Sequence, residues 1–450
     1  MKNRWSVVFV LALSTTACGV FAAGLAACTG DDATEVPADS GIVADSGIVG
    51  DASTFDGSIR DAGAVDTGAV VTDSGVGRPP WALFTYDYSD QSDLAALSLD
   101  SGAIDGVLNY PSKYGTTAIA TDGPWALEQF TDVVAKLDPN APWKVVSSWN
   151  VKGTDDGGTS YADPFKVVTG PAGKDYVVRF ERNQIAVLDT TQIGTNLTPS
   201  KFIDLSAYVD PTDEDGEIDM VSAAYVASQH RLYVLLGNFD LYLVDPKGSF
   251  TLCGTTHSEI VAIDTDTDTL VSATDGGAAT APVVLGGYNA IGLVPDLARD
   301  RLLAITAGCS DPGPPDAGIP GPTHMREVDA FDLTTGEATR ALDLDSNGYP
   351  TAYAVTDPTH LAIGFDFGFS ANTWDVTTNA LGAAIANAPD VFAYDGQGNL
   401  VGAKTEYLVD GGQATSLVSV RLDDAGVTTY GAPSYRKQPA FLSAVDFWAP

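Results

Sequence analysis

Short apolar segments that each end in an aspartate and a turn recur along the chain beyond Trp81, and they constrain its fold more than any other feature. The segments have strand-like patterns, and no stretch sustains the 3.6-residue period of an amphipathic helix. Successive ends are 38, 51, 75, 68, 43 and 48 residues apart. Repeated all-β units of roughly 40–50 residues are the signature of propeller blades. A pair of β-sandwiches with coincidental aspartate turns is the alternative. The ends fall at Asp100, Asp138, Asp189, Asp264, Asp332, Asp375 and Asp423.

The order of elements within a unit is clearest from Pro164 to Asp189, which predicts three strands with a turn at Gly170–Gly173. Met220–Leu236 and Ala290–Thr306 follow the same plan. These units resemble the YncE-like β-propeller family, and the resemblance extends over about Trp81 to Trp448. It implies the architecture and leaves the function open, because the motif residues are structural. We expect each aspartate, placed after the last strand of its unit, to cap a turn through its side chain.

The two ends of the repeat region predict a closed ring. Ala82–Tyr88 and Asp93–Leu99 match the last two strands of a unit, and Ala440–Trp448 matches an early strand. One blade would therefore be shared between the termini. We expect residues 81–450 to form a single all-β, seven-bladed β-propeller, because closure hides the sheet edges that otherwise promote aggregation.

The first 27 residues have the features of a secretory signal. Lys2 and Arg4 precede an apolar run and a stretch of small residues. Leu25 to Cys28 reads Leu-Ala-Ala-Cys, which resembles the lipobox of bacterial lipoproteins. The resemblance implies that Cys28 is lipidated and becomes the mature N-terminus. Cys18 is the poorer candidate because Thr15 stands where the lipobox has an aliphatic residue.

The location that follows is the bacterial cell envelope, with the protein held by a lipid anchor in a membrane. Thr29 replaces the aspartate that retains lipoproteins of enteric bacteria at the inner membrane. We therefore expect the outer membrane or the cell surface. A plain signal peptide followed by a chance cysteine is the alternative.

Residues 28–80 predict a disordered tether. From Thr29 onward this stretch holds nine Asp, one Glu and two Arg, a net charge of −8, and Phe55 is its one aromatic residue. Low hydrophobicity with like charge cannot offset the entropy of ordering. A calcium-binding β-roll would need a regular nine-residue period, whereas successive Asp-x-Gly motifs are 6, 16, 5 and 7 residues apart. Tethers of this composition resemble those of myxobacterial lipoproteins.

Two insertions lengthen the units that end at Asp264 and Asp332 by roughly 20–30 residues. The first holds an additional strand-like segment, Asp240–Pro246, and then Gly248–Glu259. The second is the Pro- and Gly-rich stretch Gly308–Glu327. We place both between the third and fourth strands of their blades. Loops carry function more often than strands do, so specificity is expected here, and rim decoration without a ligand is the alternative.

A disulfide between Cys253 and Cys309 is expected. Export places both in an oxidising compartment, and they are the cysteines left once Cys18 is removed and Cys28 is lipidated. Each lies in one of the insertions, which emerge on the same face of consecutive blades. Closing this 56-residue loop stabilises by about 4 kcal/mol in the chain-entropy treatment. Two free thiols in loops that never meet are the alternative.

The charge balance limits the partners. Acids outnumber bases 59 to 23, and the net charge of −36 excludes a general nucleic-acid binder and argues against docking on anionic lipid through the protein surface. No HExxH, CxxC or GxSxG motif occurs. The sequence therefore gives no catalytic residue, no cofactor and no metal ligand.

Three weaker metal hypotheses were weighed against structural roles. His257 and His324 could share an ion with Glu259 and Glu327, but solvated loop histidines are favoured. Asp343 to Gly348 matches the first half of an EF-hand loop, yet Ala354 stands where the bidentate glutamate belongs. The acidic runs, Asp210–Asp219 and Asp264–Asp268, are interpreted as solvated loops, the first of which could face the central channel.

Two classes of function remain. In the favoured one, the propeller is a monomeric binding or scaffold module for a protein or small-molecule ligand on the propeller face. In the other, it is an envelope enzyme of the lactonase or quinoprotein-dehydrogenase type, with a site over the central channel. Such sites need carboxylate, Asn, His or Arg side chains that converge from several blades, and the sequence marks no such set. We therefore leave enzymatic activity open and favour binding.

Overall fold

The computed structural model describes residues 81–87, 92–110, 115–120, 123–153, 161–171, 173–211, 216–239, 256–274, 281–308, 325–365, 370–407, 413–431 and 441–448. The expected signal segment, the tether and Cys28 lie outside these residues, as do Cys253 and Cys309.

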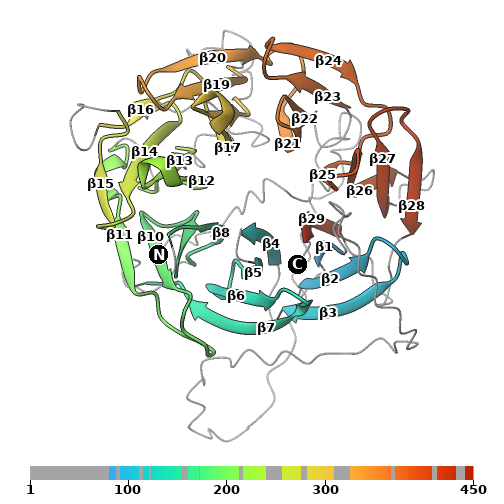
Figure 1. Ribbon diagram of the computed structural model, residues 1–450, viewed down its shortest axis with the longest axis horizontal. Helices are drawn as coiled ribbons and strands as arrows, with labels where there is room; N and C mark the ends of the chain where they lie inside the picture. Colours follow the sequence, from blue (N-terminus) through green and yellow to red (C-terminus); the bar gives the residue numbers. More distant parts are fainter. Residues whose placement is uncertain are drawn as a thin grey trace, which may run out of the picture.

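The described residues form a seven-bladed β-propeller, as predicted, with seven antiparallel sheets arranged in a ring (Figure 1). From the innermost strand outward, the first four blades are blade 1, β29 (Phe441–Trp448), β1 (Trp81–Asp87), β2 (Ser92–Ser98) and β3 (Ile104–Tyr110); blade 2, β4 (Gly115–Ala120), β5 (Gly123–Glu128), β6 (Val133–Asp138) and β7 (Ala141–Asn150); blade 3, β8 (Pro164–Thr169), β9 (Lys174–Arg179), β10 (Gln184–Asp189) and β11 (Lys201–Asp204); and blade 4, β12 (Met220–Val226), β13 (Arg231–Leu236), β14 (Glu259–Asp264) and β15 (Thr269–Val271), with β16 (Val283–Val284) also paired to β14.

The remaining three blades have the same order. They are blade 5, β17 (Ala290–Asp296), β18 (Arg301–Thr306), β19 (Glu327–Asp332) and β20 (Ala338–Asp343); blade 6, β21 (Pro350–Asp357), β22 (His360–Phe365), β23 (Ser370–Asp375) and β24 (Ala380–Ala384); and blade 7, β25 (Val391–Tyr394), β26 (Asn399–Tyr407), β27 (Gln413–Arg421) and β28 (Val427–Gly431). Three short 3₁₀ turns complete the described elements, namely η1 (Ser206–Tyr208), η2 (Ala227–Gln229) and η3 (Leu297–Arg299).

The predicted ring closure is confirmed. The C-terminal strand β29 pairs antiparallel with β1, from Trp81 opposite Trp448 to Asp87 opposite Phe441, with one register shift at Thr85. The N-terminal segment supplies three strands of blade 1 and not two, because β3 follows β2.

The predicted position of the aspartates within a blade was off by one strand. Each blade has one of the seven segment ends, but it lies at or just beyond the end of the third strand and not the last. The fourth strands escaped notice because they lie at the rim. For example, β24 (Ala380–Ala384) is mostly exposed and β11 (Lys201–Asp204) has one buried residue. A strand with one solvated side lacks the apolar pattern on which the sequence argument rests.

The position of the two insertions changes for the same reason. Residues 237–258 connect β13 to β14, and residues 307–326 connect β18 to β19. Both therefore join the second and third strands, not the third and fourth. The strand predicted at Asp240–Pro246 lies outside the described residues.

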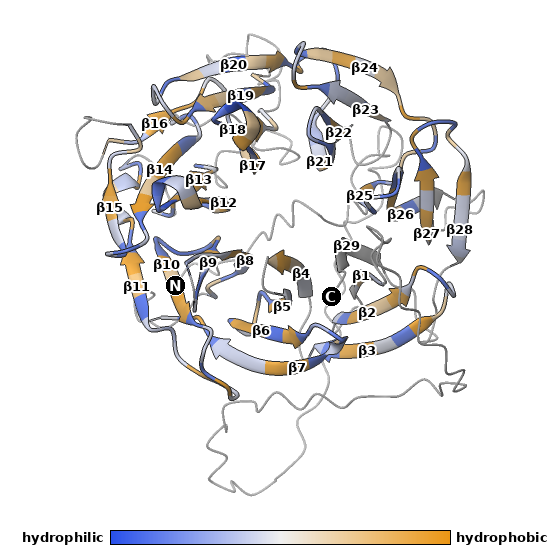
Figure 2. Ribbon diagram, viewed as in Figure 1, coloured by the Kyte–Doolittle hydropathy of each residue, from blue (hydrophilic) through white to orange (hydrophobic). Residues whose placement is uncertain are grey.

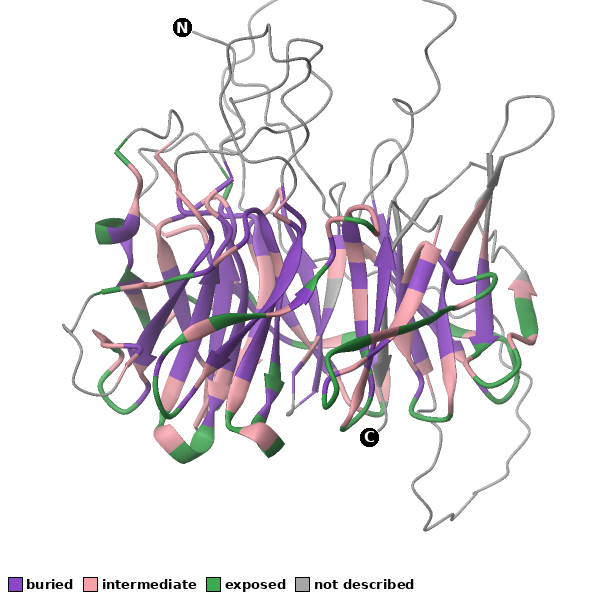
Figure 3. Cartoon of the chain, turned by 90° about the horizontal axis from the view of Figure 1, so that it is seen from above, coloured by how far each residue is buried: buried purple, intermediate pink, exposed green. Residues whose placement is uncertain are grey.

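Two faces of the ring can now be defined. The loop face holds the connections between second and third strands and the links from one blade to the next. The turn face holds the connections between first and second and between third and fourth strands. Figure 3 shows buried residues along the middle of the strands and exposed residues at the turns. Both insertions lie on the loop face of consecutive blades.

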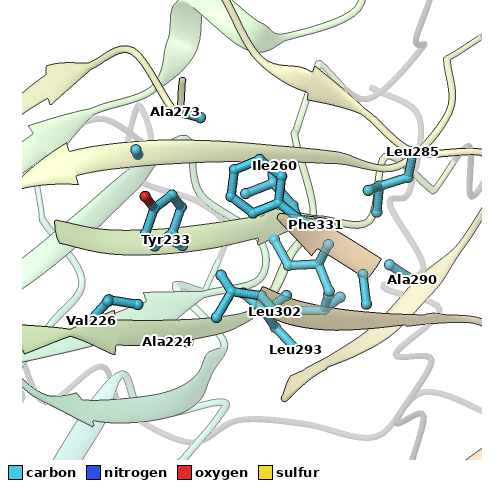
Figure 4. Packing of buried hydrophobic residues seen from close by; sticks show 14 of the residues in the cluster. Ala224, Val226, Tyr233, Ile260, Ala273, Leu285, Ala290, Leu293, Leu302 and Phe331 are labelled. Atoms are coloured by element: carbon cyan, nitrogen blue, oxygen red, sulfur yellow. The ribbon is translucent and has the colours of Figure 1, made fainter. Parts of the chain in front are cut away.

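The core consists of seven apolar clusters of described residues, one at each interface between neighbouring blades. Hydrophobic residues accordingly lie along the strands of every blade (Figure 2). At the interface of blades 4 and 5, Tyr233 and Phe331 are fully buried with ring centroids 5.5 Å apart (Figure 4). Such a pair contributes about 0.5–1.5 kcal/mol beyond the area that it buries.

A candidate functional site on the loop face

The aspartates at the third-strand ends have structural roles on the turn face. Asp264 accepts hydrogen bonds from the backbone N–H groups of Asp266 and Thr267, at 3.0 and 2.9 Å. Asp332 and Asp375 accept the equivalent pairs of bonds. The predicted capping is therefore confirmed for these residues. It fails at two ends, because Asp424 replaces Asp423 as the acceptor and the Ser98 hydroxyl caps the turn that contains Asp100.

The turn-face carboxyls are stabilised in their charged form. The hydroxyl and backbone N–H of Thr377 lower the pKa of Asp375, and the equivalent bonds from Thr267 lower the pKa of Asp264. Hydrogen bonds to a carboxylate favour its ionised state. The described carboxyls with lowered pKa values all lie on the turn face and are Asp189, Asp264, Asp332, Asp357, Asp375 and Asp424.

The loop face has the opposite electrostatic character. Burial, the largest cause in each case, raises the pKa of every described carboxyl that shows an upward shift, and all of these lie at loop-face ends of strands or immediately before first strands. They are Glu128, Asp163, Glu259, Glu327, Asp329 and Asp390. Strongly perturbed carboxyls are concentrated at functional sites in proteins. The loop face is therefore the candidate functional face.

The densest group of these carboxyls lies where blade 4 meets blade 5. The link from β16 to β17, residues 285–289, is fastened to the start of β14 through Ser258. Its N–H donates to the Gly287 carbonyl at 3.2 Å, its carbonyl accepts from Leu285 N at 2.9 Å, and its Oγ accepts from Ala290 N at 3.0 Å. This link fixes the position of two consecutive glycines, Gly286 and Gly287.

A pair of carboxyls on β19 packs against those glycines. Asp329 Oδ2 accepts hydrogen bonds from the N–H groups of Gly286 at 3.0 Å and Gly287 at 3.4 Å. A Cβ atom at Gly286 would overlap the Glu327 carboxyl, so the chain needs glycine there. Glu327 and Asp329 are 4% and 1% exposed, and they lie two residues apart on one side of the strand.

These two carboxyls titrate as a unit. Burial, followed by the charge of Asp329, raises the pKa of Glu327 to about 7, while the Arg340 guanidinium opposes this shift. Burial also raises the pKa of Asp329, although the glycine N–H groups favour its ionised form. The arrangement therefore holds a proton between two side chains at neutral pH.

His257 and Glu259 complete the group on the blade 4 side. The His257 ring lies on Tyr288 with centroids 4.1 Å apart, and its Nδ1 is 3.0 Å from the Gly286 carbonyl oxygen. A carbonyl can only accept, so Nδ1 carries a proton. Burial raises the pKa of Glu259 to about 7, and Asp210 adds to the shift. The site can thus exchange protons near neutrality and accept cationic groups.

The histidines and glutamates considered for a metal are only partly brought together. Glu259 and Glu327 begin the third strands of neighbouring blades and His257 precedes β14, while His324 lies outside the described residues. Within the described ranges, no group of three or more His, Cys, Asp or Glu side chains is arranged to hold a metal ion. His230 and His360 are instead next to Asp266 and Asp357, at 3.2 and 2.9 Å.

The acidic sequence runs also have structural explanations. Asp343 accepts the backbone N–H of Asp345 at 3.0 Å in the turn before β21, and Ala354 is buried within that strand. Asp219 is fully buried and its Oδ2 accepts the Phe239 N–H at 2.8 Å. This acidic loop joins β11 to β12 on the loop face, so the expectation of a merely solvated run is wrong for Asp219.

Sequence reasoning missed Asp329, Glu128, Asp163 and Asp390. Each resembles an ordinary polar residue at a strand boundary, and nothing in the local pattern shows that tertiary packing buries it. One signal was available, because Gly286-Gly287 lies immediately before the apolar strand β17. Paired glycines beside a strand often mark a close approach of another group.

Mildly acidic conditions are expected to give the highest stability. Between pH 4.5 and 7 the folded state keeps protons on Glu128, Glu259 and Glu327 that the unfolded state has released, so stability falls as pH rises through this window. The lowered turn-face pKa values act in the other direction, and their stabilisation is lost below about pH 4. The unfolding temperature should therefore be higher at pH 5 than at pH 8.

Glu327→Gln should reduce this slope, because the amide cannot ionise and can still donate to Asp329. Asp375→Asn on the turn face serves as the matched control and should leave the slope between pH 5 and 8 unchanged. Thermal melts of the three proteins across this range measure the effect. Equal slopes for wild type and Glu327→Gln would contradict the assignment.

Comparisons with known proteins bear on the fold alone. No model of a known protein family matches the chain, and no curated protein does. Among solved structures, a chain of Kuenenia stuttgartiensis hydrazine synthase is 14% identical, with a TM-score of 0.49, over 81% of this chain and 99% of that one. The β-propeller domain of Myceliophteria thermophila Cps50 (Swd1) is 12% identical, with a TM-score of 0.47, over 78% and 96%. Streptogramin B lyase is 11% identical, with a TM-score of 0.46, over 82% and 98%.

The chain is therefore a seven-bladed β-propeller protein by its own strand topology. Membership of the YncE-like family and an origin in myxobacteria stay expectations. In the described part of the chain, no helix is long and apolar enough to cross a membrane.

Proposed function

We propose that the chain is a cell-envelope lipoprotein whose propeller is a binding module, with its ligand surface on the loop face over blades 4 and 5. One observation carries the choice of surface: the buried carboxyls with raised pKa values segregate to the loop face, and three of them lie at this junction. The two long second-to-third-strand connections begin and end beside them. Loops held by a rigid scaffold are the usual place for recognition.

The anchor and the spacer rest on the sequence. Cys28 would be lipidated at the outer membrane or cell surface, and residues 28–80 would hold the propeller, residues 81–450, away from the bilayer. These residues lie outside the described part of the chain, so the support is the Leu-Ala-Ala-Cys segment and the composition that follows it.

A partner with basic groups fits this surface best. Residues 81–450 have 49 acidic and 19 basic residues, a net charge of −30. A field of this sign steers cationic partners towards the protein and repels acidic ones. A buried, proton-holding carboxyl can also lose its proton when a cation arrives, which couples binding to local charge.

The proposal can be tested with a fluorescent Lys- and Arg-rich decapeptide and the full mature chain. Glu259→Gln combined with Glu327→Gln should weaken binding by about tenfold or more, which corresponds to 1.4 kcal/mol. The control combines Asp189→Asn with Asp375→Asn, which removes the same number of charges from the turn face. Equal weakening by both pairs would show attraction to net charge alone and would reject the loop face as the ligand surface.

The enzyme hypothesis predicts a different location. Its site would lie over the centre of the ring, formed from the innermost strands. The loop-face carboxyls described above belong instead to second and third strands or to links between blades. Binding is therefore the better-supported function.

The disulfide between Cys253 and Cys309 is also a proposal. Both connections that contain these cysteines leave the loop face of consecutive blades, so the revised strand assignment keeps them on the same side. Mature protein that is unfolded without reduction should show no reactive thiol, since Cys28 carries lipid. Two thiols per chain in this titration would rule the disulfide out, and reduced protein supplies the control for complete labelling.

A further inference from the structure

The carboxyl pair on β19 connects the bases of both long loop-face connections. Glu327 is the first residue after the connection of residues 307–326. Asp329 binds the N–H groups of Gly286 and Gly287. These glycines bind in turn to His257 and Ser258, the last residues of the connection of residues 237–258. One network therefore joins the two connections across the junction of blades 4 and 5.

We propose that this network is a proton-controlled latch, which holds the two connections together while Glu327 carries a proton and loosens when that proton is lost. The inference concerns how the junction responds to pH and does not depend on the identity of any ligand. It differs from the proposed function, because the latch would act in the free protein.

The hydrogen-bonding capacities identify Glu327 as the residue that carries the proton. Asp329 already accepts from two backbone N–H groups, which favours its ionised form. Two carboxylates cannot hydrogen-bond each other without a proton, so Glu327 donates to Asp329. The directions of the pKa shifts agree, since the bond raises the pKa of Glu327 and lowers that of Asp329.

Few charged groups face this pair. Arg340 Nε on β20 is 3.6 Å from Glu327 Oε2, but the Arg340 side chain is 57% exposed and therefore largely screened by solvent. Asp343, also on β20, opposes ionisation of Glu327. From blade 4, His257 favours ionisation of Asp329. None of these groups is a buried cation that could neutralise a second negative charge.

Loss of the proton would therefore place two adjacent negative charges in a nearly water-free position. Glu327 is 4% exposed, and its carboxyl lies against the Gly286 backbone. A buried, unpaired carboxylate is costly, and it becomes hydrated only if the glycine link moves away. The expected movement frees the Gly286 and Gly287 N–H groups and releases their contact with His257.

Hydrogen exchange of the full mature chain in detergent micelles tests this directly. After correction for intrinsic rates, protection of residues 285–290 should fall by up to about tenfold per pH unit between pH 6 and 8, the limit for one linked proton. The segment 344–349, which links blades 5 and 6, is the internal control and should keep its protection. Constant protection at residues 285–290 would overturn the proposal.

Two variants separate the latch from general loosening. Glu327→Gln keeps a donor towards Asp329 without a titrating group, so protection should become independent of pH. Arg340→Gln removes the cation that favours ionisation of Glu327, so the midpoint of the loss should move to higher pH. Arg340 is exposed, which makes this variant informative even if Glu327→Gln folds poorly. A midpoint that stays in place or moves to lower pH would reject the latch.

Discussion

Deleting Ala440–Pro450 is expected to abolish the cooperative unfolding transition of the whole propeller. Strand β29 supplies all the pairing along the inner edge of β1, in seven residue pairs from Trp81 to Asp87. At about 0.5–1.5 kcal/mol for each lost hydrogen bond, the loss is about 4–10 kcal/mol. This is comparable with the total stability of most domains, and it opens a ring that otherwise has no end.

Calorimetry of the truncated and full-length proteins measures this effect. A variant that lacks residues 29–80 is the matched control, and it should melt like the full chain, because we expect those residues to contribute nothing to the fold. Limited proteolysis should likewise remove residues 29–80 while the propeller survives. A truncated protein that melts within about 2 °C of the full one would show that closure is dispensable, since a 1 kcal/mol change already shifts the midpoint by that much.

Cys28→Ser is expected to move the protein completely from the membrane fraction to the soluble fraction. Stable anchoring takes at least two lipid signals, and a lipoprotein N-terminus supplies its acyl chains through this one cysteine. Fractionation and incorporation of labelled palmitate measure both consequences.

Cys18→Ser is the matched control, because Cys18 also follows the basic and apolar residues of the signal segment. It should leave anchoring and labelling unchanged. Release by Cys18→Ser, or persistent membrane association of Cys28→Ser, would show that the lipid is attached elsewhere or that another part of the chain holds the membrane.

The fold was predictable to the level of blade number and ring closure, because both depend on buried strands with strong local patterns. The third strand of a blade, such as β10 or β14, has neighbours on both sides and is apolar throughout. Rim strands such as β24 pair on one side and face solvent, so they give little signal. This difference explains why the insertions were assigned one connection too late.

The candidate site was predictable only in part. Glu259 and Glu327 attracted attention because they border the insertions, and the structure places them at one junction. Asp329 did not, because its role depends on two glycines about forty residues away in the sequence. Burial of a carboxyl beside a distant backbone is a property of tertiary packing, and no local pattern encodes it.

The position of β29 at the very end of the chain has a consequence for biosynthesis. Strand β1 is made early, but its partner appears only after the intervening strands of the other six blades. At about 5–20 residues per second, β1 waits roughly 20–70 s for β29. During this time the apolar edge Trp81–Phe84 has no partner on its inner side, and such edges recruit other chains. An exported chain that cannot close before its last residues are made also stays unfolded enough to be translocated, so late closure would favour secretion and make the nascent chain dependent on chaperones.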